Sequence, residues 1–101
     1  MKKQIKHIVF INIVDIDENR KSNNTALLKS KLEQLPSFIN EIIELEVGEN
    51  ISTRSAFDLS LTVVLKSNDD LNTYRTHPKH VEVLDFMKTL ELKTAVVDYY
   101  F

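Results

Sequence analysis

The sequence predicts an α+β fold in which four antiparallel strands carry helices on one face. Three observations lead to this prediction. Several stretches are β-branched or alternate with the two-residue period of a strand, other stretches repeat leucines at helical spacing, and these elements follow one another in the order βαββαβ. The 101 residues suffice for one compact unit, so we assign residues 1–101 to a single domain.

The first strand is predicted in KHIVFINIVD, residues 6–15, which is rich in β-branched and aromatic residues. The two-residue alternation places His7, Val9, Ile11 and Ile13 on one face and Ile8, Phe10, Asn12 and Val14 on the other. Residues 19–35 follow as a helix, because Leu28, Leu32 and Leu35 recur at helical spacing before Pro36 ends it. The first strand is therefore apolar on both faces.

The second strand is predicted in residues 39–48, with Ile43, Leu45 and Val47 on one face. The third occupies residues 56–65, and its apolar face consists of Phe57, Leu59, Leu61, Val63 and Leu65. Ser67 then caps a helical stretch, and Pro78 opens another that runs to about Leu90. Residues 93–101 form the last strand, which is again apolar on both faces.

This element order is the ferredoxin-like arrangement, with four antiparallel strands and helices on one face. The helices can cover only one sheet face, yet the other face is expected to carry Ile8, Phe10, Val14, Val96 and Tyr100. An apolar sheet face of this extent needs a partner, and the same face of a second copy is the simplest one. We therefore expect a homodimer whose sheets meet and form an α/β barrel.

Composition excludes several classes of function. The absence of cysteine removes disulfides and sulfur-ligated zinc, and a single glycine leaves no Gly-rich phosphate loop. The net charge of −2 lacks a basic face, so no nucleic-acid partner is expected. No signal peptide or apolar run of membrane-spanning length is present, which predicts a cytoplasmic protein without a membrane partner.

The stretch YRTHPKH, residues 74–80, is the strongest chemical lead in the chain. His80 falls in the first turn of the helix that Pro78 opens and shares a face with Val83, Leu84 and Met87. Its imidazole could accept a proton while the Tyr74 phenol donates to an enolate oxygen, with His7 lining the same cavity. The structural alternative is that His80 bonds a buried carbonyl and Tyr74 fills the core.

Other polar residues receive structural interpretations. His77 and His80 with Glu82 or Asp85 could hold a metal, but Pro78 breaks the helical spacing between the histidines, and no metal is expected. The remaining two acidic residues of interest, Asp58 and Asp98, are expected to face the dimer interior with structural roles. We expect them to be paired there with backbone N–H groups or with a lysine across the interface.

Several segments resemble the stress-responsive A/B barrel family: KHIV, LP, VG, FDLSLTVVLKS, YRTHPKH and VVDYY. The resemblance spans essentially the whole chain and implies a ferredoxin-like homodimer whose sheets form a barrel. In a plant polyketide cyclase of this family, which uses no metal or cofactor, the catalytic Tyr and His match Tyr74 and His80. The histidine that lines its site matches His7, whereas Leu28 and Leu59 stand where that enzyme has a Tyr and a His.

The expected site thus has Tyr74 and His80 as catalytic residues. Its expected ligand-binding residues are His7, Leu28, Leu59, Leu84 and Met87. The expected function is binding of a small apolar or carbonyl-containing ligand, with cofactor-free proton transfer of the lyase or cyclase kind. The alternative hypothesis is a non-catalytic, stress-associated structural dimer.

Overall fold

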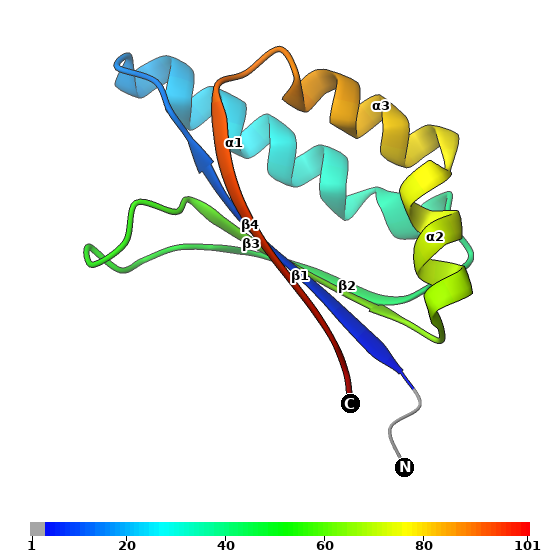
Figure 1. Cartoon of the computed structure of the whole chain (residues 1–101). Coiled ribbons are helices and arrows are strands. Elements are labelled where there is room, and N and C mark those ends of the chain that lie inside the picture. The colour runs from blue at the N-terminus through cyan, green and yellow to red at the C-terminus, as the bar shows by residue number, and fades with distance from the viewer. Residues whose placement is uncertain (1–3) are drawn as a thin grey trace.

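Four strands and three α-helices form two layers in this computed structural model, which describes residues 4–101. The elements are β1 (Ile5–Ile13), α1 (Glu18–Glu33), the short 3-10 helix η1 (Leu35–Ser37), β2 (Ile42–Glu49), β3 (Leu59–Leu65), α2 (Asn68–Thr76), α3 (Pro78–Met87) and β4 (Leu92–Tyr100). Figure 1 shows all three α-helices on one side of the sheet. The predicted ferredoxin-like βαββαβ fold is confirmed, with its second helical part divided into α2 and α3.

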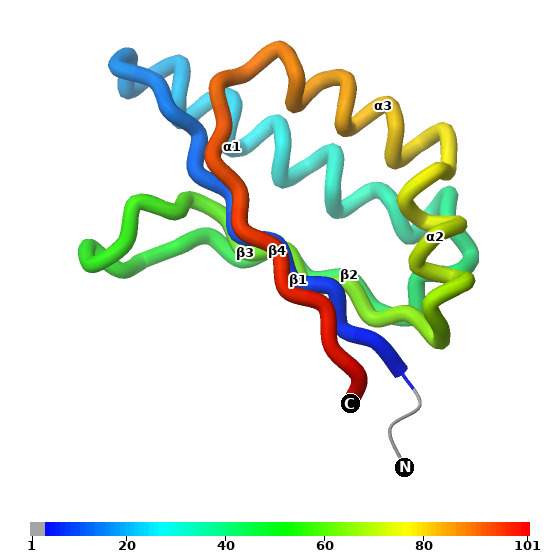
Figure 2. The backbone as a smooth tube through the Cα atoms, viewed as in Figure 1, coloured from blue at the N-terminus to red at the C-terminus, as the bar shows by residue number. Residues whose placement is uncertain are grey.

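The sheet has the order β2-β3-β1-β4, so β1 lies inside it and β4 is an edge strand. β1 pairs antiparallel with both β3 and β4, and His7 lies opposite Val63 on one side and Asp98 on the other. Figure 2 shows the first and last strands running side by side along their whole length. Elements from opposite ends of the sequence therefore build the centre and edge of the sheet.

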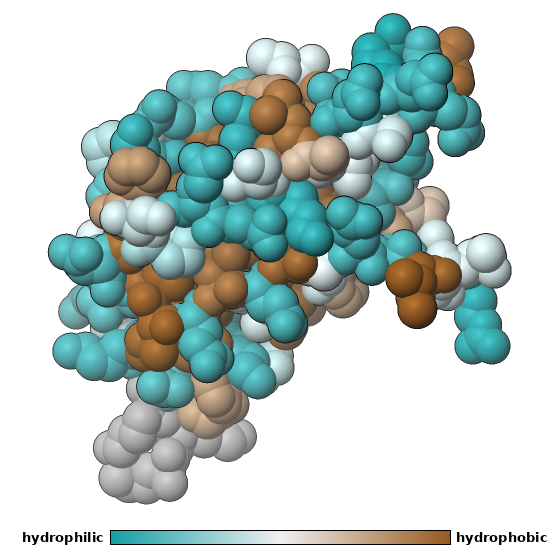
Figure 3. All heavy atoms as spheres, turned by 180° about the vertical axis from the view of Figure 1, so that it is seen from behind, coloured by the Kyte–Doolittle hydropathy of each residue, from teal (hydrophilic) through white to brown (hydrophobic). Residues whose placement is uncertain are grey.

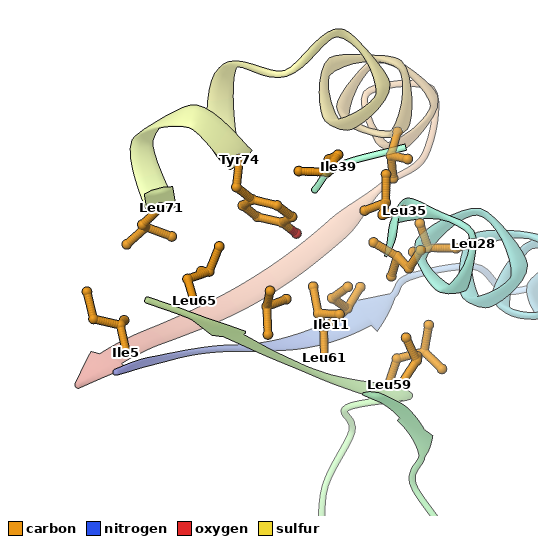
Figure 4. Packing of buried hydrophobic residues seen from close by; sticks show 14 of the residues in the cluster. Ile5, Ile11, Leu28, Leu35, Ile39, Leu59, Leu61, Leu65, Leu71 and Tyr74 are labelled. Carbon is orange, nitrogen blue, oxygen red and sulfur yellow. The ribbon is translucent and has the colours of Figure 1, made fainter. Parts of the chain in front are cut away.

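The hydrophobic core lies between the helices and the sheet face that they cover (Figure 4). Ile11 and Ile13 of β1 and Leu61, Val63 and Leu65 of β3 are buried there, as the alternation predicts. Leu28 and Leu32 cover this face from α1, and Leu71 and Tyr74 do so from α2. Side chains cap the helices: Asp17 accepts from Arg20 N, and Ser67 accepts from Asp70 N.

The predicted grouping of Ile43 with Leu45 and Val47 is wrong. The register of β2 against β3 shifts between Ile42 and Glu44, which is the mark of a β-bulge. Ile42 consequently lies opposite Leu65, whereas Ile43 is 48% exposed. The extra residue of the bulge reverses the alternation at this point. The sequence has no glycine there that would indicate a bulge.

The predicted faces of β4 are also wrong. Val96 lies opposite Val9, and Tyr100 lies opposite Ile5, so both point toward the helices, since directly opposed residues share a face. Val97 and Tyr99 occupy the open face instead, opposite Ile8 and Lys6. The cause is that β4 is apolar on both faces. Alternation alone therefore could not decide which half of its residues faces the helices.

The open face of the sheet leaves large apolar side chains in water. Phe10 is 43% exposed, Tyr99 42% and Val97 59%. Figure 3 shows the molecule from the side opposite to Figure 1, where further apolar side chains lie among hydrophilic ones toward the left of the view. The prediction that this sheet is apolar on both faces is confirmed for β1 and β4. Across residues 4–101, no helix is both long and apolar enough to cross a bilayer.

Candidate functional site

A cavity of about 350 Å³ lies between the helices and the strands β1 and β4. Most of its walls are apolar and come from β1, β3, β4, α1 and α3. Five polar residues also line it: His7, Tyr74, Arg75, His80 and Thr94. A small, largely apolar pocket with a few converging polar groups is the usual form of a small-molecule site.

The helix break at residues 77–78 brings Tyr74 and His80 together. Pro78 is the first residue of α3, where its missing N–H costs no hydrogen bond, and His80 therefore lies in the first turn. The ring of Tyr74, from the last turns of α2, lies 4.4 Å from the His80 ring between centroids. His77 is the N-cap of α3, and its Nδ1 accepts from Lys79 N at 3.1 Å.

His80 is arranged as a neutral base. Its Nδ1 donates to the main-chain oxygen of Arg75 at 3.0 Å, because a carbonyl can only accept, and this leaves the Nε2 lone pair free. Burial lowers the pKa of His80 below its ordinary value, so the ring is uncharged at neutral pH. A neutral imidazole with a free Nε2 can take a proton from a ligand.

His7 is held by a carboxylate on the neighbouring strand. Its Nδ1 lies 2.5 Å from Asp98 Oδ1, and the ring is only 7% exposed. An ionised carboxylate only accepts, so Nδ1 carries the proton and Nε2 is again left free. Asp98 also pairs through Oδ2 with Arg75 Nη2 at 3.1 Å. The His7 ring meets the Tyr74 ring edge to face, with centroids 5.9 Å apart.

The Tyr74 hydroxyl is buried without a hydrogen-bond partner among residues 4–101. Figure 4 shows its ring reaching from α2 into the space between helices and sheet. Burial raises the pKa of Tyr74, so its proton stays on and the group is a donor. A donor left unpaired in an apolar interior costs about 1–3 kcal/mol, which is the kind of cost that binding sites carry.

The structure brings together most of the predicted site residues. Tyr74, His80, His7, Leu84 and Met87 all line the one cavity. Leu28 and Leu59 do not: both are sealed in the hydrophobic core, with 0% and 1% exposure. Leu28 lies one helical turn before the cavity-lining Leu32, and Leu59 two residues before the cavity-lining Leu61. We therefore remove Leu28 and Leu59 from the candidate site.

Sequence reasoning missed Asp98 and Arg75. Asp98 was expected in the dimer interior, but its pairing with His7 places it on the helix side of the sheet. The antiparallel register of the first and last strands is the signal that could have found it. Asp58 accepts from Ile13 N, which is one of the two kinds of partner expected, but the lysine beside it is Lys21 of its own chain, 3.3 Å away.

A metal site at His77 and His80, where none is expected, would need a third ligand. In the part of the chain that the structure describes, no three His, Cys, Asp or Glu side chains come close enough to hold an ion. His77 uses its Nδ1 to cap α3, and His80 uses its own to bond Arg75 O. The nitrogen donors of the motif thus serve the helix break and the cavity.

Fold and site together define a ferredoxin-like domain with a largely apolar cavity under its helices, into which a few polar groups converge. The sequence model of the stress-responsive A/B barrel domain matches residues 5–101, and the chain belongs to this family. A search of curated proteins finds no match.

Solved structures of similar proteins agree with this assignment. A dimeric protein of unknown function and ferredoxin-like fold from Bacteroides fragilis is 30% identical, with a TM-score of 0.90 over 97% of this chain and 96% of that one. A dimeric ferredoxin-like protein of unknown function from Thermobifida fusca is 19% identical (TM-score 0.80, covering 100% and 93%). The hydroxynitrile lyase from Passiflora edulis is 18% identical (TM-score 0.79, covering 100% and 95%).

Proposed function

We propose that this chain is a homodimeric small-molecule-binding protein whose cavity transfers protons on a carbonyl compound without a cofactor. The observation that carries the proposal is the convergence of three groups on one apolar cavity: the two imidazoles of His7 and His80 and the phenol of Tyr74. Each imidazole has its Nδ1 engaged by an acceptor, so each keeps Nε2 for a ligand. The apolar walls fit an uncharged or aromatic carbonyl compound.

The chemistry that this arrangement supports is proton transfer next to a carbonyl group. His80 Nε2 takes the proton from the α-carbon, the electrons of that C–H bond form a carbon–carbon double bond, and the π electrons of the carbonyl move to its oxygen. The Tyr74 hydroxyl donates a hydrogen bond to the resulting enolate oxygen, which satisfies the unpaired donor. Return of the proton from His80 to carbon completes an exchange. Attack of the enolate carbon on a second carbonyl of the same molecule, with His80 returning its proton to the new alkoxide oxygen, completes a cyclisation.

The dimeric part of the proposal is supported by the open sheet face and by the related structures. Phe10, Val97 and Tyr99 are exposed on that face, and removing them from water would favour association. The proteins from Bacteroides fragilis and Thermobifida fusca are both described as dimeric. The same face of a second copy, meeting this one in an α/β barrel, is the cover that we propose.

A lyase-like reaction is supported by one further comparison. The protein from Passiflora edulis is a hydroxynitrile lyase with this fold. At 18% identity it shares the architecture alone, so it shows that this scaffold can carry a lyase.

A second candidate is ligand binding without turnover. One observation favours it: Tyr74 is 0% exposed, so its hydroxyl reaches a ligand only if neighbouring side chains shift. His7, which is 7% exposed, lies nearly as deep. A ligand that fills the apolar part of the cavity without reaching these groups would be bound and left unchanged.

The experiment that separates the two candidates follows proton exchange on a simple carbonyl probe. We expect acetylacetone or an aryl methyl ketone to raise the thermal midpoint, and NMR in D2O to show faster loss of its α-protons with protein present. His80→Ala should remove the rate increase, because it deletes the base, whereas the control His77→Ala should retain most of it. Stabilisation by the probe without faster exchange would support binding alone, and neither effect in any carbonyl probe would contradict both candidates.

A further inference from the structure

Arg75 lies where the hydrogen bonds of both site histidines meet. Its main-chain oxygen accepts from His80 Nδ1 at 3.0 Å. Its side-chain Nη2 donates to Asp98 Oδ2 at 3.1 Å, and the other oxygen of that carboxylate holds His7 Nδ1. Arg75 also lines the cavity itself. One residue of α2 is thus connected to the orientation of two imidazoles from β1 and α3.

Asp98 needs this contact to stay on His7. Its side chain is 30% exposed on the edge strand β4, so water competes with His7 for both oxygens. A guanidinium on Oδ2 limits rotation of the carboxylate and directs Oδ1 at the imidazole. The polar groups near His7 are then Asp98 from β4, Arg75 and Tyr74 from α2 and His80 from α3.

The ion pair is a weak source of stability for the fold. The Arg75 side chain is 48% exposed, and pairs with such exposure contribute little to the free energy of unfolding. The effect of the ion pair is local. Arg75 holds the Asp98 carboxylate, and this carboxylate fixes the tautomer of the His7 ring, which is almost fully buried.

We propose that Arg75 is a positioning residue that presents the Nε2 atoms of both His7 and His80 to the cavity. Its side chain acts on His7 through Asp98, and its main chain acts on His80 directly. The purpose of this positioning rests on the proposed function. The positions of the imidazole protons of His7 and His80 can nevertheless be measured without any ligand.

The test uses the full ¹⁵N-labelled chain, whose three histidines give a simple imidazole spectrum. In the wild type, we expect His7 and His80 both to carry the proton on Nδ1, with the Nδ1–H signals protected from exchange with water. Arg75→Met, which keeps an unbranched side chain but removes the guanidinium, should speed exchange at His7 by roughly two- to fivefold, the range that a partly exposed ion pair supports. His80 should not change, because its acceptor is a main-chain oxygen.

Two further variants make the result specific. Arg75→Lys restores a cation and should recover part of the protection at His7. Arg54→Met removes an exposed arginine from the β2–β3 loop, where its backbone N donates to Ser52 Oγ, and it should alter neither histidine. If Arg75→Met folds poorly by circular dichroism, Arg75→Gln provides the same test, because it also removes the charge that pairs with Asp98 and leaves the acceptor of His7 unchanged.

Three results would overturn the inference: a wild-type His7 that carries its proton on Nε2, unchanged exchange at His7 in Arg75→Met, or an equal change at His80. The last would mean that the substitution disturbs α2 as a whole. A change confined to His7 in a protein that accelerates no carbonyl exchange would refute the proposed chemistry and leave the positioning role intact. If the wild type accelerates carbonyl exchange but Arg75→Met does not change exchange at His7, the positioning role would be refuted and the proposed chemistry would remain.

Discussion

At the scale of single residues, Tyr74 combines full burial with an unpaired hydroxyl. Its ring fills the core between α2 and the sheet, which is a structural contribution. Its oxygen contributes nothing to that packing and costs free energy unless a ligand or water meets it. The two parts of the side chain therefore predict opposite effects on stability and on binding.

Tyr74→Phe should leave the free energy of unfolding unchanged or raise it by about 1 kcal/mol, because the ring stays and the unpaired donor is removed. The same variant should bind an enolisable carbonyl probe less tightly than the wild type. Urea denaturation and thermal-shift titration measure the two quantities. A loss of more than about 1 kcal/mol would show that the hydroxyl has a stabilising partner, which contradicts the site proposed here.

His80 predicts a pH dependence of stability. Burial lowers its pKa in the folded state below the ordinary 6.5, so the unfolded chain takes up this proton first as the pH falls. Between the lowered pKa and about 6.5, the unfolded state holds more protons, and the free energy of unfolding rises with pH. Above about 6.5 neither state is protonated, and this contribution no longer changes.

The measurement is a set of urea denaturation curves from about pH 5 to pH 7 for the wild type and His80→Gln. The wild type should gain stability across this range, and the variant should gain clearly less because glutamine does not titrate. Parallel profiles for the two proteins would mean that His80 is not the group responsible.

At the scale of elements, the break between α2 and α3 determines what the motif can do. His77 ends α2 and caps α3, and Pro78 then restarts the helix, so that His80 enters the first turn of α3. In a continuous helix, Tyr74 and His80 would lie on different faces, so their rings would point away from each other. The motif is thus a corner whose geometry places two side chains at one cavity.

His77→Ala should cost about 0.5–1 kcal/mol, because the Lys79 N–H loses its side-chain acceptor at the start of α3. His77→Asn should restore this stability, since asparagine is a preferred N-cap. Urea denaturation of the three proteins checks the order. The affinity for a carbonyl probe should change little in either variant, and a strong loss in both would place His77 in the site.

Elements also show where sequence reasoning succeeds. The alternation gave the buried faces of β1 and of Leu59 to Leu65 in β3 correctly, because both strands have strongly apolar residues on the side of the helices. It was wrong for Phe57, which precedes β3 and whose ring lies 5.6 Å from that of Phe10, a residue of the open face. It also failed for β4, which has apolar residues on both faces, and for Ile43, where a bulge shifts the register. Asp98 could not be placed without the pairing of β1 and β4, since its partner lies 91 residues away in the sequence.

The candidate site was predicted in part for the same reason. Tyr74, His80, Leu84 and Met87 come from one continuous segment, so helical spacing and Pro78 were enough to group them. Leu28 and Leu59 entered by analogy with a related enzyme, and a difference of one helical turn or one strand repeat moves them into the core. Arg75 was missed because its side chain extends from helix α2 to Asp98 of strand β4, a contact that helical spacing within one segment cannot show.

At the scale of the whole molecule, the open sheet face predicts the oligomeric state. Light scattering at micromolar concentration should give about twice the 11.7 kDa mass of the chain. Phe10→Asp should shift this mass toward the monomer, because the dimer would then bury a charge without a partner. Ile16→Asp is the matched control, because Ile16 is fully exposed outside the strands and should not affect assembly. A monomeric wild type would contradict the face-to-face arrangement.

The pairing of β1 with β4 also has a consequence for how the protein is made. β1 leaves the ribosome first of the four strands and β4 last, so one side of β1 has no neighbour until nearly all the chain has been synthesised. An unpaired strand with Ile8, Val9 and Phe10 in sequence is a template for wrong association during that interval. The same delay applies to His7, whose carboxylate partner arrives with the last strand. Newly made chains that still lack β4 are therefore expected to associate wrongly more readily, at the same stage at which His7 has no carboxylate partner.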